Sequence, residues 1–264
     1  MFKYIRLVFL MGIFIIWDYF AWMLPYSRHP ERYPLELRYQ KARKLVLRLV
    51  RACRIDFHIE NQDYVQPGHV YFFVGNHLSF YDAIMILAVN EHPVKFVGKI
   101  ESRKYPFVGR VFRALSGEFI ERDNLKQELK VARKVEASLQ NHEHSWYIYP
   151  EGTRNKDPYA PMLPFKPGTF RIPLNTKTTI IPFASFGNFR PLSFKINLKR
   201  FPIQIRYLKP IPYEEIQGMT TIAIAEMVYA RLQPEVDALR AKDVDYIAEI
   251  TLGKNKKKSP KGKK

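Results

Sequence analysis

Short apolar runs alternate with stretches of helical periodicity along most of the chain. Runs rich in β-branched and aromatic residues, bounded by turn residues, predict strands. These runs are VYFFV (70–74), VKFVG (94–98), EFIER (118–122), SWYIY (145–149), TTIIPFAS (178–185), LSFKINLKR (192–200) and PIQIRYLK (202–209). Helical spacing of apolar residues predicts helices at SFYDAIMILAV (79–89), FVGRVFRAL (107–115), residues 125–139 and residues 220–239.

Strands that alternate with helices predict an α/β domain with a mixed, largely parallel sheet flanked by helices. The chain has 264 residues and shows neither an internal repeat nor a second hydrophobic core, so one such domain suffices. We assign residues 56–245 to it.

Residues 1–55 have a different pattern, typical of a membrane-docking helical hairpin. LVFLMGIFIIW (7–17) carries no charge, and its extension to residue 24 includes Asp18. A full span needs about 20 apolar residues, so this segment is either a short span or an anchor within one leaflet. Residues 41–54 place lysines and arginines between apolar positions at helical spacing, which predicts a basic amphipathic helix. That helix either covers the core of its own domain or docks on a membrane.

The charge of the chain points to anionic partners. Lysine and arginine number 43 against 25 aspartates and glutamates, a net charge of +18. Residues 246–264 contain the lysine-rich stretch GKNKKKSPKGKK, which predicts a disordered tail that can bind an acidic membrane surface. With the apolar N-terminal segment, this predicts a protein associated with the cytoplasmic face of the cell membrane.

The sequence argues against disulfides, a metal site and nucleic-acid binding. A single cysteine, Cys53, excludes an internal disulfide framework and indicates no metal cluster. His142 and His144 are more typical of surface residues than of a metal site, so we expect no bound metal. Nucleic acid is not an expected partner, because the chain has no recognisable nucleic-acid-binding module.

Candidate chemistry begins in VGNHLSFYDAIMI (74–86), where a strand ends and a helix starts. Ser79 and Asp82 have the spacing of a capping box, which by itself favours a helix cap with His77 as a bystander. Alternatively, His77 is a general base and Asp82 fixes its tautomer. The strand end is where α/β sheets bind ligands. Ser79 is a weak candidate for a nucleophile, because the G-x-S-x-G elbow is lacking.

The turn YPEGTRN (149–155) follows another predicted strand and has two interpretations. In one, Glu151 and Arg154 form an ordinary surface ion pair worth less than about 1 kcal/mol. In the other, Arg154 offers a planar fork to a phosphate, and Glu151 accepts from a hydroxyl or orients the arginine. Arg122, at the end of a further strand, can point to the same site.

The order of these motifs resembles one family. Asn76-His77-x4-Asp82 precedes Gly98-Lys99, Pro106-Phe107-Val108-Gly109, Gly117-x-Phe119-Ile120-Glu121-Arg122, Tyr149-Pro150-Glu151-Gly152-Thr153-Arg154 and Ile180-Ile181-Pro182. This series resembles the glycerolipid acyltransferases (PlsC-like). Within them it is most similar to the 1-acyl-sn-glycerol-3-phosphate (lysophosphatidate) acyltransferases.

The resemblance implies an O-acyltransferase that moves a fatty acyl group from a thioester to the free sn-2 hydroxyl of 1-acyl-glycerol-3-phosphate, giving phosphatidic acid. His77 and Asp82 are then the catalytic base and its orienting partner. Acyl-CoA or acyl carrier protein is the co-substrate, the lysophospholipid and an anionic membrane are the other partners, and no cofactor is implied. Substrate-binding roles are implied for Asn76, Lys99, Gly117, Arg122, Glu151, Gly152, Thr153, Arg154 and Pro182.

Two other functions fit parts of the sequence: acyl transfer to a different acceptor, and binding of anionic lipid or nucleic acid without catalysis. Phe183 is larger than the valine common there in the family and bears on the acyl or acceptor pocket, so another lysophospholipid or an amino-lipid is an alternative acceptor. A non-enzymatic protein that binds anionic lipid or nucleic acid through its basic segments also fits the composition. That alternative leaves the ordered motifs unexplained.

Overall fold

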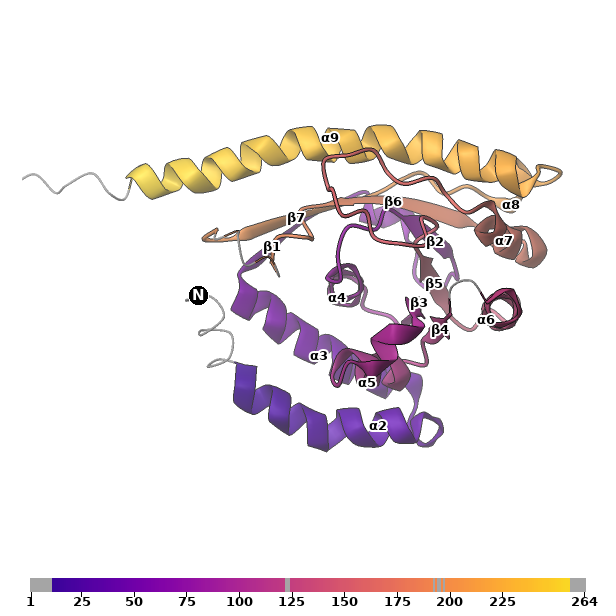
Figure 1. Ribbon diagram of the computed structural model, residues 1–264, viewed down its shortest axis with the longest axis horizontal. Helices are drawn as coiled ribbons and strands as arrows, with labels where there is room; N and C mark the ends of the chain where they lie inside the picture. Colours follow the sequence, from indigo (N-terminus) through magenta and orange to yellow (C-terminus); the bar gives the residue numbers. More distant parts are fainter. Residues whose placement is uncertain (1–10, 122–123, 192, 194–195, 197, 257–264) are drawn as a thin grey trace, which may run out of the picture.

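The computed structural model describes residues 11–121, 124–191, 193, 196 and 198–256, the last six of these by their backbone alone (Figure 1). The strands are β1 (Ile55–Glu60), β2 (Phe72–Gly75), β3 (Val94–Lys99), β4 (Glu118–Ile120), β5 (Ser145–Ile148), β6 (Ile180–Phe186) and β7 (Phe201–Tyr207). The α-helices after helical residues 11–18 are α2 (Leu24–Arg28), α3 (Leu35–Cys53), α4 (Asp82–Val89), α5 (Val108–Ala114), α6 (Leu125–Gln140), α7 (Arg171–Thr176), α8 (Tyr213–Ile216) and α9 (Thr221–Lys256). The shorter helical turns are η1 (Tyr19–Met23), η2 (Pro30–Arg32), η3 (Gln62–Tyr64), η4 (Ile100–Lys104) and η5 (Pro167–Phe170).

One seven-stranded sheet organises the molecule, in the order β1-β7-β6-β2-β5-β3-β4. Strands β6 and β7 pair antiparallel, and every other neighbouring pair in the described chain is parallel. The predicted mixed, largely parallel sheet flanked by helices is therefore confirmed.

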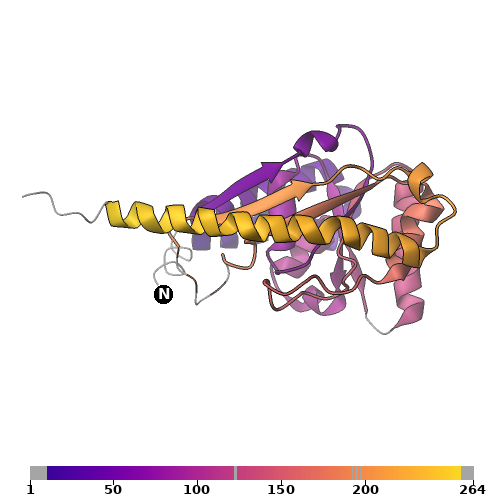
Figure 2. The same ribbon diagram turned by 90° about the horizontal axis from the view of Figure 1, so that it is seen from above.

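Both faces of the sheet are covered, which is why its central strands are apolar throughout. Phe73 joins the core formed with α3, α4 and α5, whereas its neighbours Phe72 and Val74 join the core formed with α6 and α9. Figure 1 shows α9 on one side of the sheet and α2 and α3 on the other. In Figure 2, α9 runs along the length of the molecule.

Two strand predictions differ from the structure. Strand β1 was not predicted, although Ile55, Phe57 and Ile59 alternate as a half-buried strand requires; it pairs parallel with β7. The predicted strand at 192–200 is wrong for its described residues, which lie in irregular backbone, and its other residues lie outside the described chain. Apolar alternation alone does not supply a neighbouring strand, and pairing decides whether a run enters the sheet.

The last helix is longer than predicted. It continues beyond residue 239 to Lys256, so residues 246–256 are helical rather than part of a disordered tail, and residues 257–264 lie outside the described chain. Contacts with distant segments hold the extension. Asp243 pairs with Arg190, and the Tyr246 ring stacks on His58 with centroids 4.1 Å apart.

The basic amphipathic helix is confirmed as α3, and its apolar face packs on its own domain. Tyr39, Ala42, Val46 and Val50 lie in the core beside α4 and α5. Arg38 is also buried and donates to the carbonyl of Ala114 and, at 2.9 Å, to Ser116. This face is therefore not available to a lipid surface.

The apolar segment at the N-terminus lies partly outside the described chain, which begins at residue 11. Within the described residues, no helix is both long enough and apolar enough to cross a bilayer.

Gly75, the last residue of β2, offers a test of the packing against β6. A Cβ added there would sit 2.3 Å from the ring of Phe183, which is fully buried among Tyr147, Tyr149 and Tyr207. We predict that Gly75→Ala lowers the free energy of unfolding by about 1–3 kcal/mol through overpacking, measured by urea denaturation.

Two variants control that measurement. A Cβ at Gly168 would meet nothing within 4 Å, so Gly168→Ala should change stability by less than about 1 kcal/mol. A smaller side chain in Gly75→Ala/Phe183→Leu should recover part of the loss. An unchanged unfolding midpoint for Gly75→Ala would contradict the close approach.

Candidate active site

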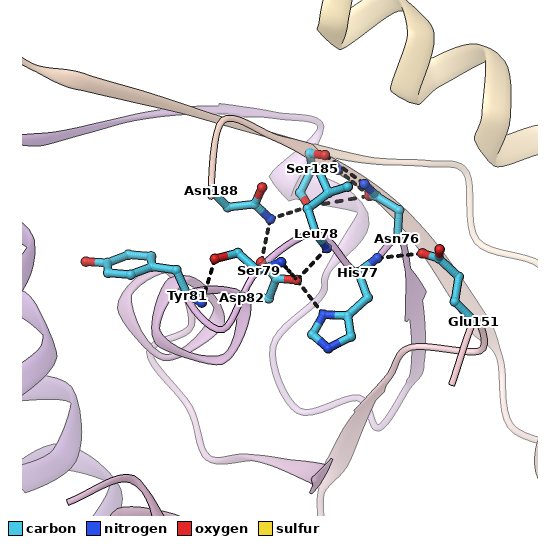
Figure 3. A network of polar contacts seen from close by, with 9 residues as sticks. All are labelled: Asn76, His77, Leu78, Ser79, Tyr81, Asp82, Glu151, Ser185 and Asn188. Carbon is cyan, nitrogen blue, oxygen red and sulfur yellow. Dashed lines mark hydrogen bonds and ion pairs between the residues drawn. The ribbon is translucent and has the colours of Figure 1, made fainter. Parts of the chain in front are cut away.

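The carboxyl end of β2 leads directly into the residues that are able to carry out acid–base chemistry. His77 lies in the loop that follows the strand, and Asp82 is the first residue of α4. Nδ1 of His77 lies 2.6 Å from Oδ2 of Asp82 (Figure 3). The strand end thus brings the imidazole and the carboxylate into direct contact.

This contact determines the tautomer of the neutral His77 ring. An ionised carboxylate can only accept, so in the neutral ring Nδ1 carries the proton and Nε2 keeps the lone pair. The imidazole stacks on the ring of Tyr149, with centroids 4.4 Å apart and planes 17° from parallel. Its side chain is 22% exposed, whereas that of Asp82 is wholly buried. The pair therefore has the geometry of a general base with an orienting partner.

Asp82 also has part of the predicted capping role. The backbone N–H groups of Leu78 and Ser79 donate to its Oδ2 at 3.0 and 3.1 Å. The hydroxyl of Ser79 accepts from the N–H of Tyr81 at 3.0 Å. The cap contacts and the contact with His77 therefore occur together, because one carboxylate oxygen accepts from the loop and from the imidazole.

Glu151, after β5, holds the backbone around His77. Its carboxylate accepts from the N–H of His77 at 2.7 Å and from the N–H of Leu163 at 2.9 Å. The N–H of Asn155 in turn donates to the carbonyl of His77 at 2.8 Å. Burial raises the pKa of Glu151, and these N–H donors offset only part of the rise. The sequence predicted a substrate-binding residue, and the structure places this carboxylate on backbone donors.

Gly152 allows this turn to form. Its φ is +66°, and an added Cβ would meet the side chain of Lys166 at 2.7 Å. The left-handed backbone and the approach of Lys166 together favour glycine here.

Two other predicted substrate-binding residues lie behind the site. Asn76 is fully buried; its Nδ2 donates to the carbonyl of Ser185 at 2.9 Å, and its Oδ1 accepts from the Ser185 N–H at 2.8 Å. Pro182 lies within β6, opposite Val74 of β2. Both residues join the strands that position the loop of His77.

The cationic candidates lie at the carboxyl ends of neighbouring parallel strands. Lys99 closes β3, and its Nζ pairs with Glu101 at 2.8 Å. Arg154 follows β5, is exposed, and places its guanidinium 5.4 Å from the centroid of the Phe80 ring. Because β2, β5 and β3 are adjacent and parallel, these groups share one edge of the sheet with His77.

The remaining predicted residues are placed as follows. Thr153 is exposed beside Arg154. Gly117 precedes β4, and a Cβ added to it would clash with the ring of Phe112. Arg122 lies outside the described residues. In the part of the chain that is described, the acidic, histidine and cysteine side chains form no group of three or more that could hold a metal ion.

Sequence reasoning missed Asn188 and Ser185, which complete the polar network. Asn188 is fully buried and donates through Nδ2 to Oδ1 of Asp82 at 2.5 Å and to the hydroxyl of Ser185 at 3.2 Å. Both residues lie more than 100 positions from Asp82 in the sequence. The glycine before Asn188 signals a turn, but nothing local signals its partner.

Known proteins are similar to this chain in sequence. Residues 56–185 match the family described as Acyltransferase. A 1-acyl-sn-glycerol-3-phosphate acyltransferase of Cocos nucifera is 27% identical over 175 residues, which is 65% of this chain and 55% of that protein. One of Saccharomyces cerevisiae is 28% identical over 182 residues, 68% of this chain and 58% of that protein. The chain thus aligns with a little over half the length of these relatives.

A solved structure shares the fold. The crystal structure of the 1-acyl-sn-glycerophosphate (LPA) acyltransferase PlsC from Thermotoga maritima matches with a TM-score of 0.69 at 20% identity. The match covers 91% of this chain and 95% of that one.

The buried Glu151 leads to a prediction about pH. A carboxyl whose pKa is higher in the folded than in the unfolded state stabilises the fold below its unfolded pKa, and this contribution is lost as pH rises through the folded pKa. The free energy of unfolding of the wild type should therefore fall relative to that of Glu151→Gln as pH rises through this window. Urea denaturation of both proteins between about pH 4 and 8 measures the difference.

The matched control is Glu214→Gln, which changes an exposed glutamate. Its stability should follow that of the wild type at each pH. A difference between wild type and Glu151→Gln that stayed flat, or grew in favour of the wild type with rising pH, would contradict the effect of burial.

Proposed function

Because residues 56–185 match the acyltransferase family, we propose that the protein is a lysophosphatidate O-acyltransferase. It transfers a fatty acyl group from a thioester to the sn-2 hydroxyl of 1-acyl-glycerol-3-phosphate and releases phosphatidic acid. The contact of His77 with Asp82 at the end of β2 is the observation that carries the proposal. The names of the similar proteins support this acceptor.

In the proposed mechanism, His77 activates the substrate directly. Its Nε2 removes the proton from the acceptor hydroxyl as the oxygen attacks the thioester carbonyl. The tetrahedral intermediate collapses, the carbon–sulfur bond breaks, and the leaving thiolate takes the proton back from the imidazolium. Asp82 stabilises the imidazolium between these steps. No acyl-enzyme forms, so no serine or cysteine of the protein acts as a nucleophile.

The charge of the acceptor suits the edge of the sheet beside His77. Lys99 and the exposed Arg154 are cations on neighbouring strand ends, and Arg154 offers a planar fork that matches phosphate. We assign the glycerol phosphate to these groups together with Arg122. Acyl-CoA or acyl carrier protein supplies the thioester, and the mechanism uses no further cofactor.

Membrane association forms the second part of the proposal. The described N-terminal helix exposes apolar side chains, with Ile13 80%, Trp17 70% and Phe20 66% accessible. Asp18 of the same helix pairs with Arg48 of α3 at 2.9 Å, so the helix is fixed on the domain with this face outward. Such a face, on a strongly basic protein, suits insertion into one leaflet of an anionic membrane at its cytoplasmic side.

The first test measures acyl transfer from acyl-CoA and from acyl carrier protein to lysophosphatidate by the detergent-solubilised protein. Wild type should form phosphatidic acid. His77→Ala and Asp82→Asn should each lower kcat/KM by about 10²–10⁴, the usual contribution of general base catalysis. Activity that survived in His77→Ala would contradict the role of the base.

The matched control for that assay is His69→Ala. His69 is an exposed histidine before the opposite end of β2, so its removal should leave kcat/KM within about twofold of the wild type. A wild type that acylated no lysophospholipid from either donor would contradict the proposed function as a whole.

The second test replaces Ile16, Trp17 and Phe20 by serine in one protein. Each side chain would otherwise bury apolar surface worth about 1.5 kcal/mol or more, so the affinity for anionic vesicles should fall at least about tenfold in a flotation assay. Ile222→Ser is the control, because Ile222 is 58% exposed on α9, on the other side of the sheet. Equal binding of the triple variant and the wild type would contradict this docking face.

A further inference from the structure

We propose that Asn188 is a positioning residue, which orients the carboxylate of Asp82 and through it the base His77. The inference rests on the proposed function and deepens it. Nδ2 of Asn188 lies 2.5 Å from Oδ1 of Asp82, and neither side chain is exposed to solvent (Figure 3). Asn188 does not reach the reacting atoms, so its contribution passes through the carboxylate.

The two oxygens of Asp82 have different partners. Oδ2 accepts from the imidazole of His77 and from the N–H groups of Leu78 and Ser79. Oδ1 accepts from Asn188. A buried charged oxygen without a donor is costly, and the carboxylate would rotate or move to regain one. The amide of Asn188 thus keeps Oδ2 aimed at the imidazole.

An asparagine suits this role because its amide donates without adding charge. A lysine or arginine at this place would compete with the imidazolium for the carboxylate. The orientation of the amide is also determined by chemistry. Its Oδ1 is buried and has no hydrogen-bond partner among the described residues, and a flipped amide would turn this oxygen toward the carboxylate. Only the observed orientation joins Asn188 to Asp82.

The loop that carries Asn188 is held rigidly after β6. Gly187 has a φ of +89°, and an added Cβ would sit 2.3 Å from the carbonyl oxygen of Pro202. Arg190 forms a buried ion pair with Asp243 of α9, and Gln204 of β7 donates to the same aspartate at 3.4 Å. The position of the amide therefore depends on the second half of α9.

The first experiment compares Asn188→Ala and Asn188→Asp with the wild type in the full chain, by acyl transfer to lysophosphatidate. Asn188→Ala should lower kcat by about 10- to 100-fold and leave KM within about twofold, because the acceptor does not touch Asn188. An unchanged kcat would overturn the proposal.

The pH profile separates positioning from a merely structural role. Asn188→Asp is nearly isosteric and adds a carboxyl beside Asp82; the other titratable groups that act on Asp82 are His77, Glu151 and Tyr149. Two buried carboxyls in contact cannot both ionise, so they share one proton and one negative charge. Part of the charge of Asp82 is thereby drawn away from the imidazolium, and the acid limb of kcat/KM should move to lower pH by about one unit. Lower activity with an unmoved acid limb would indicate a structural role and overturn the proposal.

A spectroscopic measurement tests the proposal without the reaction. The proton shared by Nδ1 of His77 and Asp82 should give a low-field proton NMR signal in the wild type that is absent in Asp82→Asn. Asn188→Ala should shift or broaden this signal, and an unchanged signal would overturn the positioning role. A wild type with the signal but no acyl transfer would contradict the proposed function alone.

Two variants at α9 test whether the support of the Asn188 loop affects catalysis. Asp243→Asn weakens the ion pair that holds the loop of Asn188, and it should reproduce part of the loss in kcat. Glu235→Gln weakens the contact of α9 with Arg206, away from that loop, and it should leave kcat within about twofold. Equal losses in both variants would indicate general destabilisation and count against the proposal.

Discussion

The site depends on one buried carboxylate. Asp82 is inaccessible to solvent and accepts from the imidazole of His77, from two backbone N–H groups and from Asn188. A buried charge is tolerated only when donors surround it, and here the donors come from the β2–α4 loop and from the loop after β6. The same carboxylate therefore joins two parts of the sheet and determines the direction in which the imidazole points.

The sheet explains why these donors meet. Parallel strands β2, β5 and β3 are neighbours, so the loops that follow them collect at one edge, where they place His77, Glu151 and Lys99. Strand β6 runs parallel to β2 on its other side and brings Asn188 to the same edge. Helix α9 then holds the Asn188 loop through Arg190 and Asp243. Helix α9, near the end of the chain, thus supports Asp82, which lies in the first third of the chain.

Of the two apolar faces in the N-terminal region, one is buried in the core and the other is exposed. In α3 the apolar stripe enters the core with Tyr39 and Val46, and Lys41, Lys44 and Arg51 are exposed. In the preceding helix, Ile13, Trp17 and Phe20 remain exposed although they are among the most apolar side chains of the region. Large exposed apolar patches are uncommon on soluble surfaces and mark interaction sites, which is why the proposed docking face lies on the first helix and not on the amphipathic one.

Local patterns determined much of this protein. Apolar periodicity sufficed to predict α3, α6 and most strands of the largely parallel sheet, because helices and strands depend on neighbouring residues. The motifs sufficed to single out His77, Asp82 and Glu151 as candidate site residues. Only the tertiary structure decided that the apolar face of α3 packs on its own domain, that β1 pairs with β7, and that α9 continues past residue 239. It alone placed Asn188 on Asp82, because that contact joins residues 106 positions apart and leaves no trace in local spacing.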